Sequence, residues 1–359
     1  MKAQNSALFG IHQSNRNFAD AYYWGKNQFN SSFPVALACY MQSRGIPLVS
    51  VNYKNASGTL LGLMSVSEVW GIDKPTQDLY FAFEHRYEPY SAWVHDDLPS
   101  IDVVICDGDK SKPIRPLEIK LTTLPDNTTE SLSEERYGTE LVIRSATTRY
   151  MALSIAQSVQ KQRKQVQAIF EPVFAKIRNW DSKEEILKIA PDVVSSLTNF
   201  LDRYKAHQKP LLLQPIWKTV GKSPQLADQC LDIFVWSDFA LTHLFLDSAR
   251  VAAAQANMNR QLRTAVRLAR FIYERSCNDK VFQAPIFDGM TYDWQNDKEF
   301  AISGTKSHGL MAHPRLTRPA ISKDDIKNII LGGGQKFLSP ERRFDAILYF
   351  STDLFAEAS

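Results

Sequence analysis

The sequence predicts an α/β (α+β) fold in which helices flank a mixed central sheet. Short runs rich in apolar and β-branched residues recur in the first half of the chain, and such runs are typical of strands. Longer segments in the second half carry apolar residues every three or four positions, which is typical of helices packed on a core. Apolar residues make up 44% of the 359 residues, enough for a substantial core. This mixture favours a layered protein of sheet and helices.

Most of the predicted strands lie in the first half. A helix is expected over 30–43 and ends at Gly45, and a strand follows over 46–53. A short helical turn is expected over 66–70, and a strand or the start of a helix over 79–83. Strands over 101–106 and 116–121 are joined by the turn Asp107-Gly108-Asp109 into a hairpin that spans 98–121. A further strand is expected over 140–144.

The second half is predicted to be helical and rich in loops. A helix is expected over 145–170, because an apolar face is formed by Met151, Ile155, Val159, Val166 and Ile169. The other expected elements are helices over 183–204, 226–247, 258–276 and 322–331, a strand over 210–220, and short strand-like runs over 280–321.

Composition limits the setting of the protein. The net charge is +3, which permits a locally basic surface without requiring one. The four cysteines are widely separated and form no CxxC pair, so we expect reduced thiols in a cytoplasmic protein. The sequence begins without an apolar signal core, and no apolar run approaches the about 18 residues of a transmembrane helix.

The candidate catalytic residues are Asp102, Glu118 and Lys120. Glu118 and Lys120 are two residues apart, so they share one face of the second strand of the hairpin. A hairpin of this length can bring Asp102 opposite Glu118, which places two carboxylates and one ammonium at the edge of a sheet. The alternative interpretation is an ordinary hairpin with a solvated Glu118–Lys120 pair.

This arrangement suits the metal-dependent hydrolysis of a phosphodiester. Mg²⁺ is held in proteins by one or two carboxylates together with other oxygen atoms. The predicted ligands are Asp102, Glu118 and the backbone carbonyl of Ile119, with Glu84 as a further acid unless it is a plain surface glutamate. Bound metal lowers the pKa of a water molecule and offsets charge on the leaving oxygen. Lys120 is expected to orient or deprotonate the attacking water, or to stabilise the transition-state phosphate.

Four arginines recur at helical spacing within the segment 258–276: Arg260, Arg263, Arg267 and Arg270. Side by side on one helical face, they would repel each other unless anions compensate them, and a phosphate backbone is one such partner. The alternative is a solvated face that Glu274 and Asp279 compensate in part. The other candidate DNA-contact residues are Lys26, Asn27, Gln28, Asn30, Arg144 and Arg149.

Pro99, Asp102, Glu118 and Lys120 together resemble the core motif of the PD-(D/E)XK nuclease superfamily. Ser100 and Ile101 separate Pro99 from Asp102, which departs from the usual pattern. The N-terminal third is similar to the HindVP-type family of type II restriction endonucleases, which includes the HgiDI-like enzymes. The segments that carry this similarity are Leu8-Phe9-Gly10, Arg16-Asn17-Phe18 and residues 24–34.

The resemblance implies a PD-(D/E)XK core over 1–220 with its catalytic hairpin at 98–121. A helical and loop-rich part over 221–359 would then serve DNA contact and dimerisation, unless both parts form one continuous domain. The resemblance further implies a Mg²⁺-dependent homodimer that cuts double-stranded DNA at a short palindrome of the GRCGYC kind and leaves 5′-phosphates. A cognate DNA methyltransferase would be its partner. Two other functions stay open: a non-catalytic DNA-binding or regulatory protein on this scaffold, and a non-specific repair or phage nuclease of the superfamily.

Overall fold

The structure is a computed structural model, and it describes a defined part of the chain. The described residues are 11–16, single positions between 32 and 45, 47–55, 58–119, 140–204, 206, 211–213, 218–220, 223–225, 234–235, 238–292 and 299–303. Within them, strands and helices mix as the sequence predicts, so the α/β (α+β) class is confirmed. The predicted helix over 322–331 lies outside the described residues.

A four-stranded mixed sheet carries the predicted hairpin. Its strands are ordered β1 (Gln13–Ser14), β4 (Leu79–His85), β5 (Ile101–Asp107) and β6 (Pro113–Leu117). β1 joins β4 in parallel, and the other neighbours are antiparallel. Both faces of β4 and β5 are buried, because Ala82 and Val104 belong to the helical core while Phe81 and Phe83 are buried on the other face.

The remaining strands form three smaller sheets. One has the order β11 (Phe234–Val235), β8 (Leu211–Leu213), β2 (Leu48–Asn55) and β3 (Gly58–Met64). The other two are pairs: β7 (Glu140–Arg144) with β12 (Glu299–Ser303), and β9 (Lys218–Val220) with β10 (Ser223–Gln225). The expected strands near 46–53 and at 140–144 are confirmed, whereas β3 was not predicted. The strand expected over 210–220 is two separate strands.

Three short helices lie between the strands described in the first half of the chain. They are α2 (Val66–Trp70), η2 (Thr76–Asp78) and η3 (Glu88–Ala92). α2 confirms the expected helical turn, and it begins with a capping box in which Ser65 and Glu68 each satisfy the other's backbone N–H. The positions described between 32 and 43 are helical, as expected, and Gly45 follows with φ 67°.

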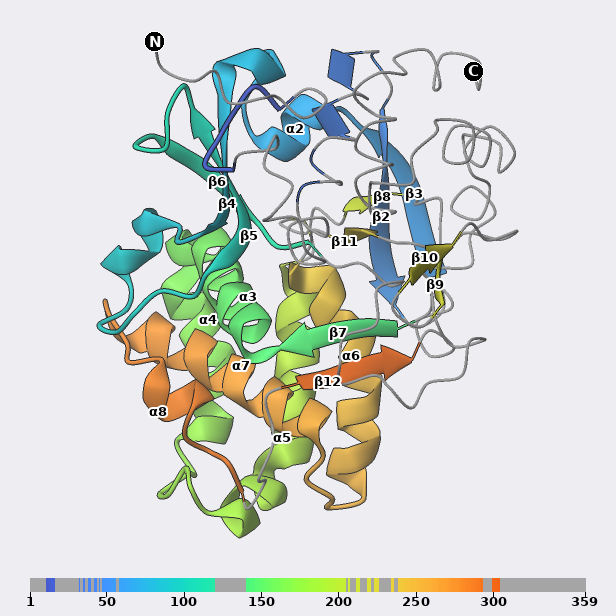
Figure 1. The fold of residues 1–359 in the computed structure, drawn as a ribbon. Helices are drawn as coiled ribbons and strands as arrows, with labels where there is room; N and C mark the ends of the chain where they lie inside the picture. The colour runs from blue at the N-terminus through green and yellow to red at the C-terminus, as the bar shows by residue number, and fades with distance from the viewer. Residues whose placement is uncertain are drawn as a thin grey trace.

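Helices pack together into a layer that lies beside the mixed sheet (Figure 1). They are α3 (Ser145–Ser158), α4 (Arg163–Phe174), α5 (Lys183–Arg203), α6 (Asp238–Ala254), α7 (Arg260–Cys277) and α8 (Ala284–Phe287). α7 is central, since it packs against α3, α4, α5 and α6. One hydrophobic core runs from Ala82 to Tyr292 and therefore spans both sides of residue 220, and the division into two domains there stays a prediction.

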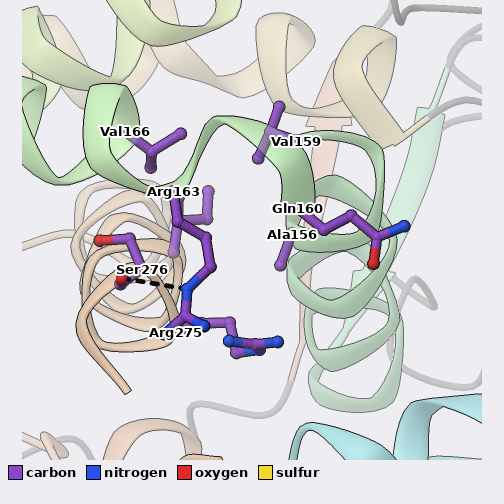
Figure 2. A pocket seen from close by; sticks show the side chains of 8 residues that line it. Ala156, Val159, Gln160, Arg163, Val166, Arg275 and Ser276 are labelled. Carbon is purple, nitrogen blue, oxygen red and sulfur yellow. Dashed lines mark hydrogen bonds between the residues drawn. The ribbon is translucent and has the colours of Figure 1, made fainter. Parts of the chain in front are cut away.

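The single helix expected over 145–170 is wrong, because the chain turns after Ser158. A 3₁₀ turn, η6 (Gln160–Gln162), separates α3 from α4. Arg163 fixes this joint against the end of α7: its Nε donates to the carbonyl of Ser276 at 3.2 Å, and its Nη1 pairs with Asp279 at 2.6 Å. Figure 2 shows Arg163 reaching Ser276 beside Arg275, around a cavity of about 10 Å³.

Two other expectations differ from the structure. α6 begins at Asp238 rather than near 226, and Phe234–Val235 forms a strand instead. The strand-like runs expected over 280–321 are confirmed in part, since β12 lies in this range, whereas Ala284–Phe287 forms the short helix α8. No helix in the described part of the chain is long and apolar enough to cross a membrane.

Candidate active site

The hairpin of β5 and β6 places the predicted catalytic acids. Its turn contains Gly108 at φ 76°, a backbone conformation that favours glycine. The N–H of Asp107 donates to the carbonyl of Lys112 at 2.9 Å and closes the turn. The second strand differs from its predicted bounds of 116–121, since β6 ends at Leu117 and the chain continues as irregular backbone through Glu118 and Ile119.

The structure brings Asp102 and Glu118 to the same end of the hairpin. Val103 pairs with Leu117 in the antiparallel hairpin, so Asp102 and Glu118 occupy the next pair of opposite positions. The N–H of Ile119 donates to Oδ2 of Asp102 at 2.6 Å, which extends the hairpin beyond the last strand pair. Asp102 is half-buried and Glu118 is 5% exposed. Asp102 and Glu118 therefore lie across from each other at a mostly buried sheet edge, and their catalytic role stays a prediction.

Helix α3 holds the buried carboxylate of Glu118. The hydroxyl of Thr147 donates to Oε1 of Glu118 at 2.8 Å, and Thr147 is itself buried. Thr147 lies in the first turn of α3, where the helix dipole favours a negative charge. Sequence reasoning missed Thr147, because nothing in the segment Ser145-Ala146-Thr147-Thr148 distinguishes it from an ordinary helix start.

Burial extends from Glu118 into the helical layer. Burial raises the pKa of the Tyr150 hydroxyl, and the nearby Asp238 and Glu118 carboxylates raise it further. Burial also raises the pKa of Asp238 to about 6, although hydrogen bonds that involve Ser154 and the Phe239 N–H work against the shift. The interior behind Glu118 is therefore a place where a charge without compensation is unfavourable.

Glu84 and Arg16 form an ion pair on the neighbouring strand. Glu84 is in β4 at φ 49°, and a non-glycine residue in this left-handed region costs on the order of 1–2 kcal/mol. Nη2 of Arg16 lies 3.2 Å from Oε1 of Glu84, and its guanidinium stacks 4.4 Å from the centre of the Phe83 ring. Burial lowers the pKa of Arg16 to about 10, although the carboxylates of Glu84 and Asp102 oppose that shift. Sequence reasoning gave Arg16 no role in the site.

The oxygen atoms at the hairpin suit a hard cation. Two carboxylates, Asp102 and Glu118, with the neighbouring backbone carbonyl of Ile119, match the one or two carboxylates by which proteins usually hold Mg²⁺. Within the described ranges, no three His, Cys, Asp or Glu side chains come together as a metal cluster. Glu84, Asp102 and Glu118 therefore do not form a three-acid cluster in this structure, and the role of Glu84 as a third ligand stays a prediction. Lys120 lies outside the described residues.

Comparison with known proteins decides the family. The family model described as HindVP restriction endonuclease matches residues 24–355. The chain belongs to the HindVP restriction endonuclease family. It is 42% identical to the type II restriction enzyme HgiDI of Herpetosiphon aurantiacus over 350 residues, which cover 98% of this chain and 97% of the relative. It is 39% identical to the probable type II restriction enzyme HindVP of Haemophilus influenzae, over 97% of this chain and 94% of the relative. No solved structure matches the chain.

The four arginines at helical spacing in α7 are called the arginine stripe: Arg260, Arg263, Arg267 and Arg270. Three of them are buried in the protein interior. Arg263, Arg267 and Arg270 are only 1%, 5% and 9% exposed. Arg263 donates to the carbonyl of Thr291 at 3.0 Å, and Arg267 donates to the carbonyl of Gly289 at 2.6 Å. Arg270 pairs with Glu274 at 2.6 Å and stacks 4.3 Å from the centre of the Trp180 ring. Burial and bonds to carbonyl oxygens favour a structural role for these three arginines, and their phosphate contacts stay a prediction.

The other predicted DNA-contact residues differ in what the structure says of them. Arg260 is half-buried at the start of α7, and Arg144 is exposed at the end of β7. Arg149 forms an ion pair with Asp288. The remaining four, Lys26, Asn27, Gln28 and Asn30, lie outside the described residues. For Arg260, Arg144 and Arg149 a role in DNA binding stays a prediction.

Proposed function

We propose that this protein is a type II restriction endonuclease that hydrolyses phosphodiesters of double-stranded DNA in a Mg²⁺-dependent reaction. The observation that carries the proposal is the Asp102–Glu118 pair at the hairpin edge, in a chain that belongs to the HindVP restriction endonuclease family. The chain matches nearly the whole length of two relatives that are named type II restriction enzymes, one of them as probable. The proposed target is a short palindrome of the GRCGYC kind, and the proposed products carry 5′-phosphates.

Each residue at the hairpin has a proposed task. Asp102, Glu118 and the carbonyl of Ile119 would hold Mg²⁺, which when bound lowers the pKa of a coordinated water and offsets charge on the leaving oxygen. The Ile119 N–H and the Thr147 hydroxyl would fix the orientation of the two carboxylates through the hydrogen bonds that they donate. Lys120 would orient or deprotonate the attacking water or stabilise the charged phosphate. Attack at phosphorus with departure of the 3′-oxygen leaves the phosphate on the 5′ side.

A plasmid-cleavage assay with Mg²⁺ tests this proposal. Discrete bands from a plasmid of known sequence are the expected result, and mapping the cut ends identifies the site. A smear would instead support a non-specific nuclease of the same superfamily. Absence of cleavage with retained DNA binding would support a non-catalytic DNA-binding protein. Ca²⁺ in place of Mg²⁺ should support binding without cleavage, because its looser oxygen geometry activates water poorly at such a site.

A two-fold homodimer is the proposed assembly. A palindrome presents the same half-site twice, so a symmetric dimer reads both halves with one surface. Sedimentation velocity of the free protein and of its complex with DNA checks this, and a monomer in both states would contradict it. Cleavage inside the producing cell requires protection of the same site, for which we propose a cognate DNA methyltransferase in the same cytoplasm.

A further inference from the structure

Arg16 is tied to the edge of the mixed sheet beside the candidate active site. It follows β1, which lies parallel to β4. The side chain of Asn15 replaces a strand residue: its Nδ2 donates to the carbonyl of Phe83, and its Oδ1 accepts from the N–H of Phe83, both at 2.8 Å. These two bonds place Arg16 next to Glu84 by backbone anchoring, independently of the ion pair itself.

The guanidinium of Arg16 is held on several sides. It stacks on the ring of Phe83, donates through Nη1 to the hydroxyl of Ser32, and meets Oε1 of Glu84 through Nη2. The Arg16 side chain is 13% exposed, whereas that of Glu84 is 50% exposed. A group with so little exposure is poorly placed to contact DNA directly, and its charge acts on the neighbouring carboxylates instead.

The strand register alone would place the Glu84 side chain beside that of Asp102. Phe83 pairs with Val103 and His85 pairs with Ile101, so Glu84 and Asp102 occupy the positions across from each other. In a regular strand both side chains would lie on the face of Ala82 and Val104. The left-handed φ of Glu84 interrupts that alternation, and its carboxylate meets Arg16, which stacks on Phe83 of the opposite face.

We infer that Arg16 is a positioning residue that keeps Glu84 apart from the Asp102–Glu118 pair, so that Glu84 joins the metal as a third acidic ligand only when the Arg16–Glu84 ion pair opens. Two independent observations carry this inference. The first is the strained backbone of Glu84, because residues with such backbone strain are concentrated at functional sites in proteins. The second is the ion pair, which engages the Glu84 carboxylate while its register partner Asp102 accepts from the N–H of Ile119. The inference rests on the proposed metal-dependent function.

Calcium binding to the full-length protein, measured by titration calorimetry without DNA, tests this inference without relying on cleavage. Arg16→Gln should release Glu84 and tighten Ca²⁺ binding roughly tenfold, the scale on which neighbouring groups tune metal sites. Glu84→Gln should change Ca²⁺ binding little, because Glu84 is not a ligand while the pair is closed. In the double variant the tightening should disappear, since the released carboxylate is gone. Arg16→Lys, which keeps the charge, should stay close to the wild type.

The contrary results are as specific. Unchanged or weaker Ca²⁺ binding by Arg16→Gln would overturn the inference. Tightening that persists in the double variant would also overturn it, because it would show that the Arg16 charge acts directly on Asp102. If Arg16→Gln does not fold, Ser32→Ala takes its place. It removes one contact of Arg16 and should tighten Ca²⁺ binding less, again only when Glu84 is present.

Asp102→Asn separates this inference from the proposed function. It should abolish Ca²⁺ binding if the Asp102–Glu118 pair is the metal site. Wild-type binding by this variant would contradict the metal site itself and with it the inference. Loss of binding in Asp102→Asn together with no effect of Arg16→Gln would contradict the inference alone.

Discussion

The Asp102–Glu118 pair and the arginine stripe of α7 both place charged side chains in buried surroundings, and they differ in what compensates the charge. Glu118 accepts from the hydroxyl of Thr147, and Asp102 accepts from the backbone N–H of Ile119. Arg263 and Arg267 instead bind the backbone carbonyls of the segment after α8. Main-chain carbonyls are part of the fold itself, so these contacts favour a structural role for the two arginines. The carboxylates have four oxygen atoms between them, and such a set can still accept a cation.

The largest expected effect is on the acid side of this comparison. Asp102→Asn, Glu118→Gln and Lys120→Ala should each lower the cleavage rate by at least about 1,000-fold, which corresponds to about 4 kcal/mol of transition-state stabilisation. The reason is that two of these groups would hold the metal and the third would act on water or phosphate. Plasmid cleavage with Mg²⁺ measures the rate, and thermal unfolding measures whether the fold is kept.

Asp97→Asn is the matched control for the carboxylates. Asp97 lies close to the hairpin in sequence, but its side chain is 87% exposed and pairs with Arg86 at 3.4 Å. This variant should cleave as the wild type does. Wild-type turnover by any of the three predicted catalytic variants would remove that residue from the mechanism.

The arginine side of the comparison predicts a loss of stability. Arg267→Ala should lower the free energy of unfolding by about 2–4 kcal/mol, because it opens a cavity and leaves the carbonyls of Gly289 and Met290 without this donor. Denaturant unfolding measures the change. Lys161→Ala, at an exposed position of η6, should change stability by less than about 0.5 kcal/mol.

DNA binding provides the opposing outcome for Arg267. A phosphate contact would lower the slope of log K against log salt by about 0.9 when the arginine is removed, with stability unchanged. Such a result would show that Arg267 contacts DNA, and the contrast between structural arginines and functional carboxylates would be wrong.

Thr147→Val should have a moderate effect that is specific to the acid site. Valine has nearly the shape of threonine but cannot donate to Glu118, so we expect cleavage to fall roughly tenfold, the lower end for groups that orient metal ligands. Thr147→Ser should restore most of the activity. Thr148→Val is the control, because the hydroxyl of Thr148 donates to the carbonyl of Arg144 instead. Equal losses in both valine variants would show a general effect on α3.

Another expected effect is a pH dependence of stability from His243 in α6. Burial lowers the pKa of His243 to about 4, whereas in the unfolded chain it is near 6.5. Between these values the unfolded chain binds a proton that the folded chain does not, so stability falls as the pH is lowered from about 6.5 to about 4. His243→Gln should remove this contribution, which is on the order of 1–3 kcal/mol.

The measurement is the difference in unfolding free energy between wild type and His243→Gln across that pH range. A difference is needed because Asp238, whose pKa burial raises to about 6, contributes with the opposite sign. The folded chain binds the Asp238 proton more readily, so that contribution increases stability as the pH falls. If the unfolding free energies of the two proteins change in parallel with pH, the pKa of His243 is the same in the folded and the unfolded chain, and the prediction is wrong.

Local patterns predicted much of the fold and the pairing of the two candidate acids. Alternating or continuous apolar runs predicted β5 and β7, and the Ser65–Glu68 spacing matches the capping box observed at α2. The break between α3 and α4 was missed because Val159 and Val166 keep the apolar periodicity across it. The joint depends on Arg163 bonding to residues more than a hundred positions away.

The sequence by itself determined that Asp102 and Glu118 lie across from each other, because a short hairpin with alternating side chains leaves few other registers. Only the tertiary structure decided which charges are available. Helical spacing placed four arginines on one face, but the segment 284–292 packs over that face and supplies carbonyls to three of them. The same holds for Thr147, Arg16 and Glu84, whose contacts join segments far apart in the chain. Spacing along a helix or strand is a local property, whereas burial depends on what packs against it.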